Sequence, residues 1–399
     1  MKAEKNYKST KRRFSLKKTR FGPLVTALAC LLLFAGFVVL IILYGPLVLN
    51  RALGCAPDWS WLIGAQSTPS PTPLISPAPT SDPAKEHPLY SVDLKDEQTE
   101  MVIADFQYLA DFSIVDGQLF CVAGNYTQDG TAAFVRLVLQ DLESNSHTYL
   151  ALDQNYKSLR FPCINEDYIV YMDAAASGGG RLMAYDRATS ESRVLKVVHV
   201  GVPRPALWGK YASWVERTGS ERDKLYLCDV ETGESVTLCI YDNSPFGLSA
   251  PCLYDGKLLY ADSEGILQLL DLLSGEAQSF DTGLYVHDPK YNGEQIAFLS
   301  GNHGSESDLY YFTAERTEPV LLSSNVTDFY LGETFAAYMK NDKVYVVFFS
   351  DGVSFCITRN EETAQLLGAG GDFVVWMDTT WREKDIVEYM HITEFDNEG

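Results

Sequence analysis

The stretch FPCINEDYIVYMDAAASGGGRLMAYDRATSESRVL, residues 161–195, carries the pattern that decides the fold. Short runs rich in Tyr, Val and Ile alternate with turns of Gly, Asp, Asn and Ser. Runs of this kind predict β-strands joined by tight turns. The stretch shows no sustained helical period, so we expect it to form strands only.

The same order of strands and turns recurs along the chain. Clear copies are PALWGKYASWVERTGSERDKLYLCDVETGESVTL (205–238), APCLYDGKLLYADSEGILQLLDLLSGEAQSF (250–280) and HDPKYNGEQIAFLSGNHGSESDLYYFTAERTEPVLL (287–322). Weaker copies lie at 112–150, 327–357 and 369–395. The units are spaced by roughly 38–48 residues, and each contains four strand-like runs. This period predicts an all-β fold, a β-propeller of four-stranded blades.

The number of blades depends on how the two ends are used. Seven units are favoured, and the terminal pieces also admit eight because together they hold nearly one strand too many. Residues 88–104, PLYSVDLKDEQTEMVIA, look like the last two strands of a unit. We expect this N-terminal segment to complete the C-terminal blade, which removes an exposed sheet edge.

The repeats resemble a broad propeller family. The resemblance rests on the iterated patterns Tyr171-Met-Asp, Tyr226-Leu-Cys-Asp and Asp229-Val-Glu-Thr-Gly-Glu, within residues 87–399. That family includes the periplasmic propeller of the Tol system and the N-terminal propeller of dipeptidyl-peptidase-IV-like proteins. The resemblance implies a fold and no activity, because the peptidase relatives carry their chemistry on a separate hydrolase domain.

A long apolar run precedes the repeats. Leu24 to Tyr44, LVTALACLLLFAGFVVLIILY, contains no charge and as a helix would be about 31 Å long, close to the thickness of the bilayer hydrocarbon. The run is longer than the apolar core of a cleaved signal peptide, and no clean cleavage site follows it. We therefore expect an uncleaved signal-anchor: a single transmembrane α-helix within residues 21–49 that contacts the lipid bilayer.

The charges on either side of this run predict its orientation. Residues 1–20 hold nine Lys or Arg and one Glu, whereas Arg51 is the nearest cation beyond the run. The positive-inside rule predicts a cytoplasmic basic tail at 1–20 and a cell-membrane protein whose long C-terminal part is extracytoplasmic. Residues 50–86 read as a juxtamembrane segment and a Pro/Ser/Thr-rich stalk, because six prolines within 66–84 favour an extended chain. The propeller is assigned to 87–399.

The net charge of the chain limits the classes of partner that it can bind. The chain has a net charge of −21, and the basic tail contributes +8, which leaves about −29 for the rest. A domain this acidic repels nucleic acid, so we expect no nucleic-acid partner. Cys228 and Cys239 flank a predicted turn and could form a disulfide, with buried free thiols as the default.

No catalytic, cofactor-binding or metal-binding motif stands out. The string Gly247-Leu-Ser249-Ala-Pro lacks the last glycine of a nucleophile elbow, and the six histidines are scattered over the repeats. Paired acids such as Glu361-Glu362 read as solvated turns. We therefore expect no cofactor and no metal.

Three carboxylates recur at the end of the second strand of a unit: Asp173, Asp262 and Asp378. They could face a cation or a basic ligand near the channel mouth. The alternative is that each hydrogen-bonds the backbone of its own turn.

The sequence thus favours a non-enzymatic role: a membrane-anchored, extracytoplasmic propeller that binds a protein or glycan partner in the cell envelope. One alternative is a propeller enzyme, a hydrolase or lyase that acts on envelope polysaccharide with acids from several blades converging on one face. Another alternative is a transmembrane sensor.

Overall fold

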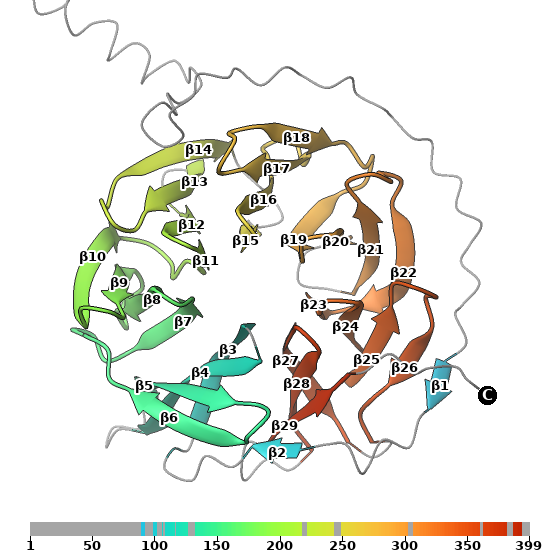
Figure 1. The fold of residues 1–399 in the computed structure, drawn as a ribbon, viewed down its shortest axis with the longest axis horizontal. Coiled ribbons are helices and arrows are strands. Elements are labelled where there is room, and N and C mark those ends of the chain that lie inside the picture. The colour runs from blue at the N-terminus through green and yellow to red at the C-terminus, as the bar shows by residue number, and fades with distance from the viewer. Residues whose placement is uncertain are drawn as a thin grey trace, which may run out of the picture. The chain divides into compact units, whose positions relative to one another are not determined.

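The computed structural model describes residues 89–91, 99–101, 106, 108–115, 117–126, 132–217, 222–242, 249–301, 306–359, 362–380 and 386–392. These residues form seven β-sheets that surround a common axis (Figure 1). The prediction of an all-β propeller is confirmed. The ring has seven blades, so the alternative of eight is not realised.

The first four blades are simple antiparallel meanders. Blade 1 contains β3 (Tyr108–Val115), β4 (Gln118–Tyr126), β5 (Ala132–Asp141) and β6 (Ser146–Leu150). Blade 2 contains β7 (Leu159–Ile164), β8 (Tyr168–Ala174), β9 (Gly180–Asp186) and β10 (Glu191–Val198). Blade 3 contains β11 (Ala206–Trp208), β12 (Tyr211–Glu216), β13 (Arg222–Asp229) and β14 (Ser235–Asp242). Blade 4 contains β15 (Cys252–Tyr254), β16 (Lys257–Ala261), β17 (Leu267–Asp271) and β18 (Ala277–Phe280).

The last three blades finish the ring. Blade 5 contains β19 (Val286–Tyr291), β20 (Gln295–Ser300), β21 (Ser307–Thr313) and β22 (Val320–Val326). Blade 6 contains β23 (Asp328–Leu331), β24 (Phe335–Lys340), β25 (Lys343–Phe348) and β26 (Ser354–Cys356). Blade 7 contains β27 (Ala364–Gly370), β28 (Phe373–Asp378) and β29 (Ile386–His391).

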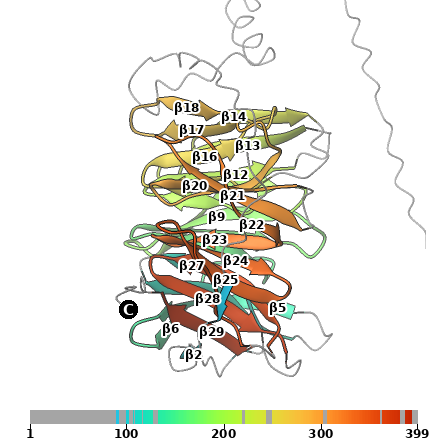
Figure 2. The same ribbon diagram turned by 90° about the vertical axis from the view of Figure 1, so that its right-hand side faces the viewer.

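The N-terminal segment closes the ring with one strand. β2 (Thr99–Met101) pairs antiparallel with β29 as the outermost strand of blade 7 (Figure 2 shows the ring edge-on). β1 (Leu89–Ser91) pairs instead with β26, parallel, as a fifth strand of blade 6. The expectation that both N-terminal strands complete the last blade is therefore half wrong. Blade 7 already supplies three strands of its own, so it has room for one more.

The second strand of a blade explains the apolar runs in the repeats. β8 reads YIVYMDA, and every residue after Tyr168 is buried. A strand in the middle of a blade is covered on both faces by neighbouring blades, so both faces select apolar side chains. The buried clusters confirm this arrangement, because each joins adjacent blades: Val170 packs with Trp214 between blades 2 and 3, and Phe335 with Trp376 between blades 6 and 7.

The predicted tail, membrane helix and stalk, residues 1–86, lie outside the described residues. Among the residues that the structure describes, no helix is long and apolar enough to span a membrane.

Candidate functional site

The inner strands carry an irregularity that points to a site on the axis. β3, β7 and β19, which lie nearest the centre in Figure 1, each contain a shift in pairing register. At each shift one residue has left-handed backbone angles: Asp111 (φ 52°), Phe161 (φ 48°) and Asp288 (φ 50°). Such angles cost a non-glycine residue of order 1–3 kcal/mol and cluster at functional sites. The side chains at these positions therefore form the candidate site.

The three residues occupy equivalent places in the repeat, and other blades contribute to the same place. Phe161, Arg204, Ala250 and Asp288 each stand directly before a proline at the start of a unit. Asp328 holds the matching place in blade 6. We call this set the axial ring, with one residue from each of blades 1 to 6: Asp111, Phe161, Arg204, Ala250, Asp288 and Asp328.

An ion pair next to the axial ring links blade 1 to blade 2. Arg160 Nε lies 2.5 Å from Asp111 Oδ2, and Arg160 Nη2 lies 3.2 Å from Oδ1. The backbone N–H of Phe161 donates to the same carboxylate at 3.0 Å. Only 7% of the Asp111 side chain is exposed. Arg160 is thus paired with Asp111, and its guanidinium also lies 4.8 Å from the centre of the Phe161 ring, so that it contacts both bulges.

Two further cations rest on aromatic rings. The guanidinium of Arg204 lies 4.7 Å from the centre of the Phe161 ring. The ammonium of Lys290 lies 4.0 Å from the centre of Tyr330 and 4.8 Å from that of Phe329. Across the described ranges, neither Arg204 nor Lys290 forms an ion pair with a carboxylate. These contacts attract the cations through the ring quadrupole and leave N–H groups for another acceptor.

The electrostatics show that these side chains share one environment. Burial raises the pKa of Asp328, while Lys290 opposes the rise and Asp288 adds to it. Burial also raises the pKa of Tyr330 well above its usual value, and the charge of Asp328 adds to the rise. Arg204, Asp288 and Asp111, from three other blades, also act on the Tyr330 phenol. The axial ring therefore combines acids, cations and aromatic rings.

Asp288 is the accessible acid of the ring. Its side chain is 39% exposed, and its carboxylate lies 3.1 Å from Nδ1 of the buried His287. Its backbone N–H donates to Ser249 Oγ at 2.7 Å, which ties blade 5 to blade 4. The strained backbone is thus supported from a neighbouring blade while the carboxylate stays reachable.

The recurrent acids Asp173, Asp262 and Asp378 lie elsewhere, each within its own blade. Asp173 is fully buried and accepts hydrogen bonds from the N–H groups of Asn155 and Tyr156 and from Arg181. Asp262 accepts hydrogen bonds from the backbone N–H groups of residues 264 and 266 and from the Gln268 side chain. Asp378 accepts one from the backbone N–H of residue 380. No hydrogen bond or ion pair of the described residues joins one of these three acids to another.

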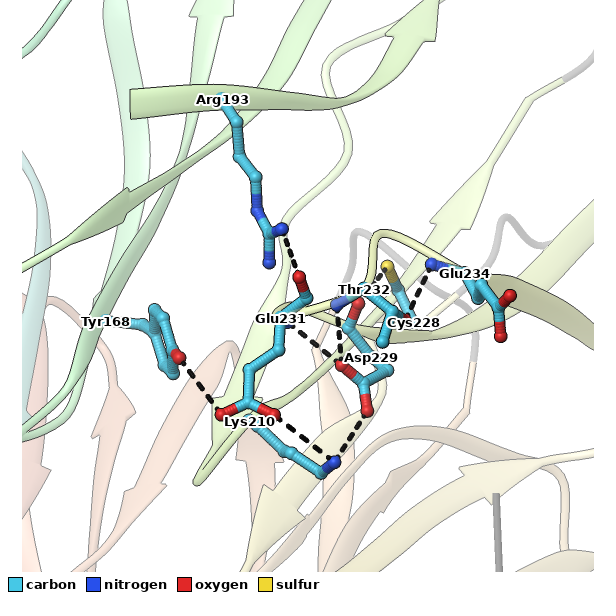
Figure 3. A network of polar contacts seen from close by, with 8 residues as sticks. All are labelled: Tyr168, Arg193, Lys210, Cys228, Asp229, Glu231, Thr232 and Glu234. Atoms are coloured by element: carbon cyan, nitrogen blue, oxygen red, sulfur yellow. Dashed lines mark hydrogen bonds and ion pairs between the residues drawn. The ribbon is translucent and has the colours of Figure 1, made fainter. Parts of the chain in front are cut away.

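A polar network lies between blades 2 and 3 (Figure 3) and borders a groove of about 270 Å³. Lys210 Nζ lies 2.8 Å from Asp229 and 3.5 Å from Glu231, and Glu231 also accepts from the Tyr168 hydroxyl. Burial acts to raise the pKa of Asp229, but Lys210 and the N–H groups of the turn together hold it below its usual value. Asp229 thus stabilises its own turn, as Asp186 and Asp271 do in neighbouring blades.

Cys228, which borders this network, is a free thiol, as is Cys239. In the sheet Cys228 pairs with Ser235, whereas Cys239 pairs with Leu225. The register places the two cysteines apart, so the disulfide considered from the sequence is not formed.

A pair of carboxyl groups is buried in blade 7. The indole N–H of Trp376 donates to Glu362 at 3.1 Å and to Glu388 at 3.0 Å. Burial, a hydrogen bond with Glu362 and the charge of Glu362 raise the pKa of Glu388 to about 7, although the charge of Arg359 acts to lower it. The expectation that Glu362 is solvated is wrong: the residue is 5% exposed, because its side chain turns inward to Trp376.

The sequence pattern does not reveal the axial ring, because the residues of the ring differ in chemistry. Phe161, Arg204, Ala250 and Asp288 share a position, and only the proline that follows each marks it. The strings FPC, RPA, APC and DPK at the start of the units are the available signal. Asp111 and Asp328 lack that proline, so the strand positions alone identify them.

Comparisons with known proteins support the fold. No family model matches the chain, and no curated protein does. Among solved structures, the propeller domain of the Trilobed protease from Pyrococcus furiosus matches with a TM-score of 0.54 and 14% identity, over 74% of this chain and 98% of that one. That propeller is described as having an open velcro topology.

Two enzymes also match. Oligogalacturonate lyase from Vibrio parahaemolyticus has a TM-score of 0.54 and 12% identity, over 76% of this chain and 96% of that one. Acylaminoacyl peptidase from Pyrococcus horikoshii has a TM-score of 0.53 and 12% identity, over 73% of this chain and 53% of that one. At such identities the likeness concerns the fold alone: the chain is a seven-bladed β-propeller.

Proposed function

We propose that this chain is a membrane-anchored, extracytoplasmic propeller that binds a protein or glycan partner of the cell envelope at the axial ring. The observation that carries the proposal is that Arg204 lies over Phe161 and Lys290 over Tyr330, while the charges of Arg204 and Asp288 both act on the Tyr330 phenol. Two cations on aromatic rings beside a reachable carboxylate form a surface with donors, acceptors and stacking faces. Protein and glycan ligands both use such surfaces.

The site can be tested by photocrosslinking the full-length chain in cells. A photoreactive amino acid at Ala250, the small member of the ring, should give discrete adducts on irradiation. The matched control carries it at Leu273, which is 70% exposed in the turn between β17 and β18. Adducts equal at both positions, or absent at Ala250, would argue against an axial binding site.

The anchor is proposed from the apolar run Leu24 to Tyr44 and the nine cations before it. Protease added to intact cells with a permeable outer layer should digest the propeller and leave the N-terminal tail protected. A tag at residue 1 and a tag at residue 399 report the two outcomes. Digestion of the N-terminal tag would mean that the orientation is the opposite of the one proposed. Recovery of the protein in the soluble fraction would mean that the apolar run does not anchor it.

An enzyme remains the second candidate, and one observation favours it. Asp111, Asp288 and Asp328 come from three blades to the same ring, and burial raises the pKa of Asp328. A carboxyl group whose pKa is raised is suited to donate a proton. Turnover of envelope polysaccharide that is lost in D328N would support this candidate, and binding without turnover would favour the first.

A further inference from the structure

Arg204 is arranged to receive a planar anion. Its exposed guanidinium lies over Phe161, with 4.7 Å between the guanidinium carbon and the ring centre. A contact with the face of a ring restrains the guanidinium and leaves N–H groups available for an acceptor. Paired N–H groups in a fixed plane match the two oxygens of a carboxylate. The first ligand group that this site favours is therefore a carboxylate.

Lys290 is the second cation at the axial ring. Its ammonium is held over Tyr330 at 4.0 Å. Arg204 extends from blade 3 over Phe161 of blade 2, and Lys290 from blade 5 over Tyr330 of blade 6, and the charges of both cations act on Asp328. A carboxylate there would meet one planar donor and one point charge.

The rest of the ring limits what else the ligand carries. Asp288, 39% exposed, and the partly buried Asp328 stand close to the two cations. Acids there repel a second anionic group and accept hydrogen bonds from N–H donors. The chain beyond the basic tail also carries about −29, which disfavours polyanions such as acidic polysaccharides. The free C-terminal end of a peptide is a ligand group that has a single carboxylate next to N–H donors.

We infer that the axial ring binds the C-terminal carboxylate of a peptide, held by Arg204 and Lys290, while Asp288 accepts a hydrogen bond from a peptide N–H. This inference rests on the proposed binding function and assigns the ligand class. Aromatic rings of Phe161 and Tyr330 would then contact the last side chains of the peptide.

The test compares two pools of random hexapeptides, identical except that one has free C-terminal carboxylates and the other has amides. Full-length chain, purified in detergent and immobilised, is incubated with each pool, and the retained peptide is quantified by mass spectrometry. We expect the free acids to be retained about ten-fold better than the amides. The substitution R204Q should abolish this preference, and R204K should restore part of it.

R222Q is the matched control, because Arg222 pairs with Asp242 on the surface of blade 3, where both side chains are more than half exposed. It should bind as the unaltered chain does. Equal retention of acids and amides, or a preference that survives R204Q in a folded variant, overturns the inference.

A third arm uses a hexameric oligouronate, which carries carboxylates without N–H groups. If the oligouronate binds in an Arg204-dependent manner and neither peptide pool does, the peptide assignment fails while axial binding stands. If nothing binds and the Ala250 crosslinks are also absent, the proposed function itself fails.

Discussion

Asp111 in blade 1 and Arg160 in blade 2 form a two-pronged ion pair, with Arg160 Nε 2.5 Å from Asp111 Oδ2 and Nη2 3.2 Å from Oδ1. The same carboxylate also accepts the backbone N–H of Phe161. One buried acid thus supports two residues whose backbone is left-handed, Phe161 and itself. The shape of the axial ring depends on this contact.

We expect D111N to lower the free energy of unfolding by about 1–3 kcal/mol, because the Arg160 guanidinium and the Phe161 N–H lose a buried, charged acceptor. Urea unfolding of the full-length chain measures the change. R222Q removes an exposed pair and should cost less than about 1 kcal/mol. Equal losses in the two variants would mean that the Asp111 pair contributes no more than a surface pair.

The pair Glu362 and Glu388 predicts a pH dependence of stability. The folded chain raises the pKa of Glu388 from 4.5 to about 7, so between these values the folded state holds more protons than the unfolded state. Stability from this group is therefore present at low pH and lost as pH rises to about 7. The loss should be roughly 1–3 kcal/mol.

Urea unfolding at pH 5 and pH 8 tests this dependence. E388Q keeps an acceptor for Trp376 and cannot ionise, so the difference between the two pH values should shrink by that amount relative to the unaltered chain. E231Q, at an exposed side chain, is the control and should leave the difference unchanged. An unchanged difference in E388Q would show that Glu388 titrates normally.

Substitution of the recurrent acids Asp173, Asp262 and Asp378 should lower stability and leave ligand binding unchanged. D173N removes the charge that faces Arg181 and should cost about 2–4 kcal/mol, and D262N and D378N about 1 kcal/mol each. Thermal unfolding and crosslinking at Ala250 measure the two effects separately. Lost crosslinks in a folded D262N or D378N variant would bring these acids back as ligand-facing groups.

The closing strand predicts a sharp difference between two truncations. Deletion of residues 1–96 removes β1 and keeps β2, whereas deletion of residues 1–104 removes both. The longer deletion leaves β29 as an open edge, so its melting temperature should fall by roughly 5 °C or more below that of the shorter one. Equal melting temperatures would mean that β2 adds nothing to the ring.

The sequence allowed the blades to be predicted because each repeats a local pattern. Runs such as YIVYMD and KLYLCDV need both faces covered, and turns such as Asp229-Val-Glu-Thr-Gly bind their own backbone. These requirements are met within one unit and its neighbours, so they leave a periodic trace. The closing strand was only partly predictable, because the choice between β26 and β29 for each N-terminal strand depends on which edge is free.

The axial ring and the Trp376 pair could not be predicted in the same way. Asp111 and Arg160 are 49 residues apart, and Glu362 meets Glu388 through the indole of a third residue. Acidic, basic, aromatic and small residues occupy equivalent positions of the ring, so no single residue type marks the position in every blade. The sequence by itself determined a series of four-stranded apolar sheets with capped turns, because burial and local hydrogen bonds act over neighbouring residues. Only the closed ring decided which side chains meet on the axis, because that meeting requires all the blades at once.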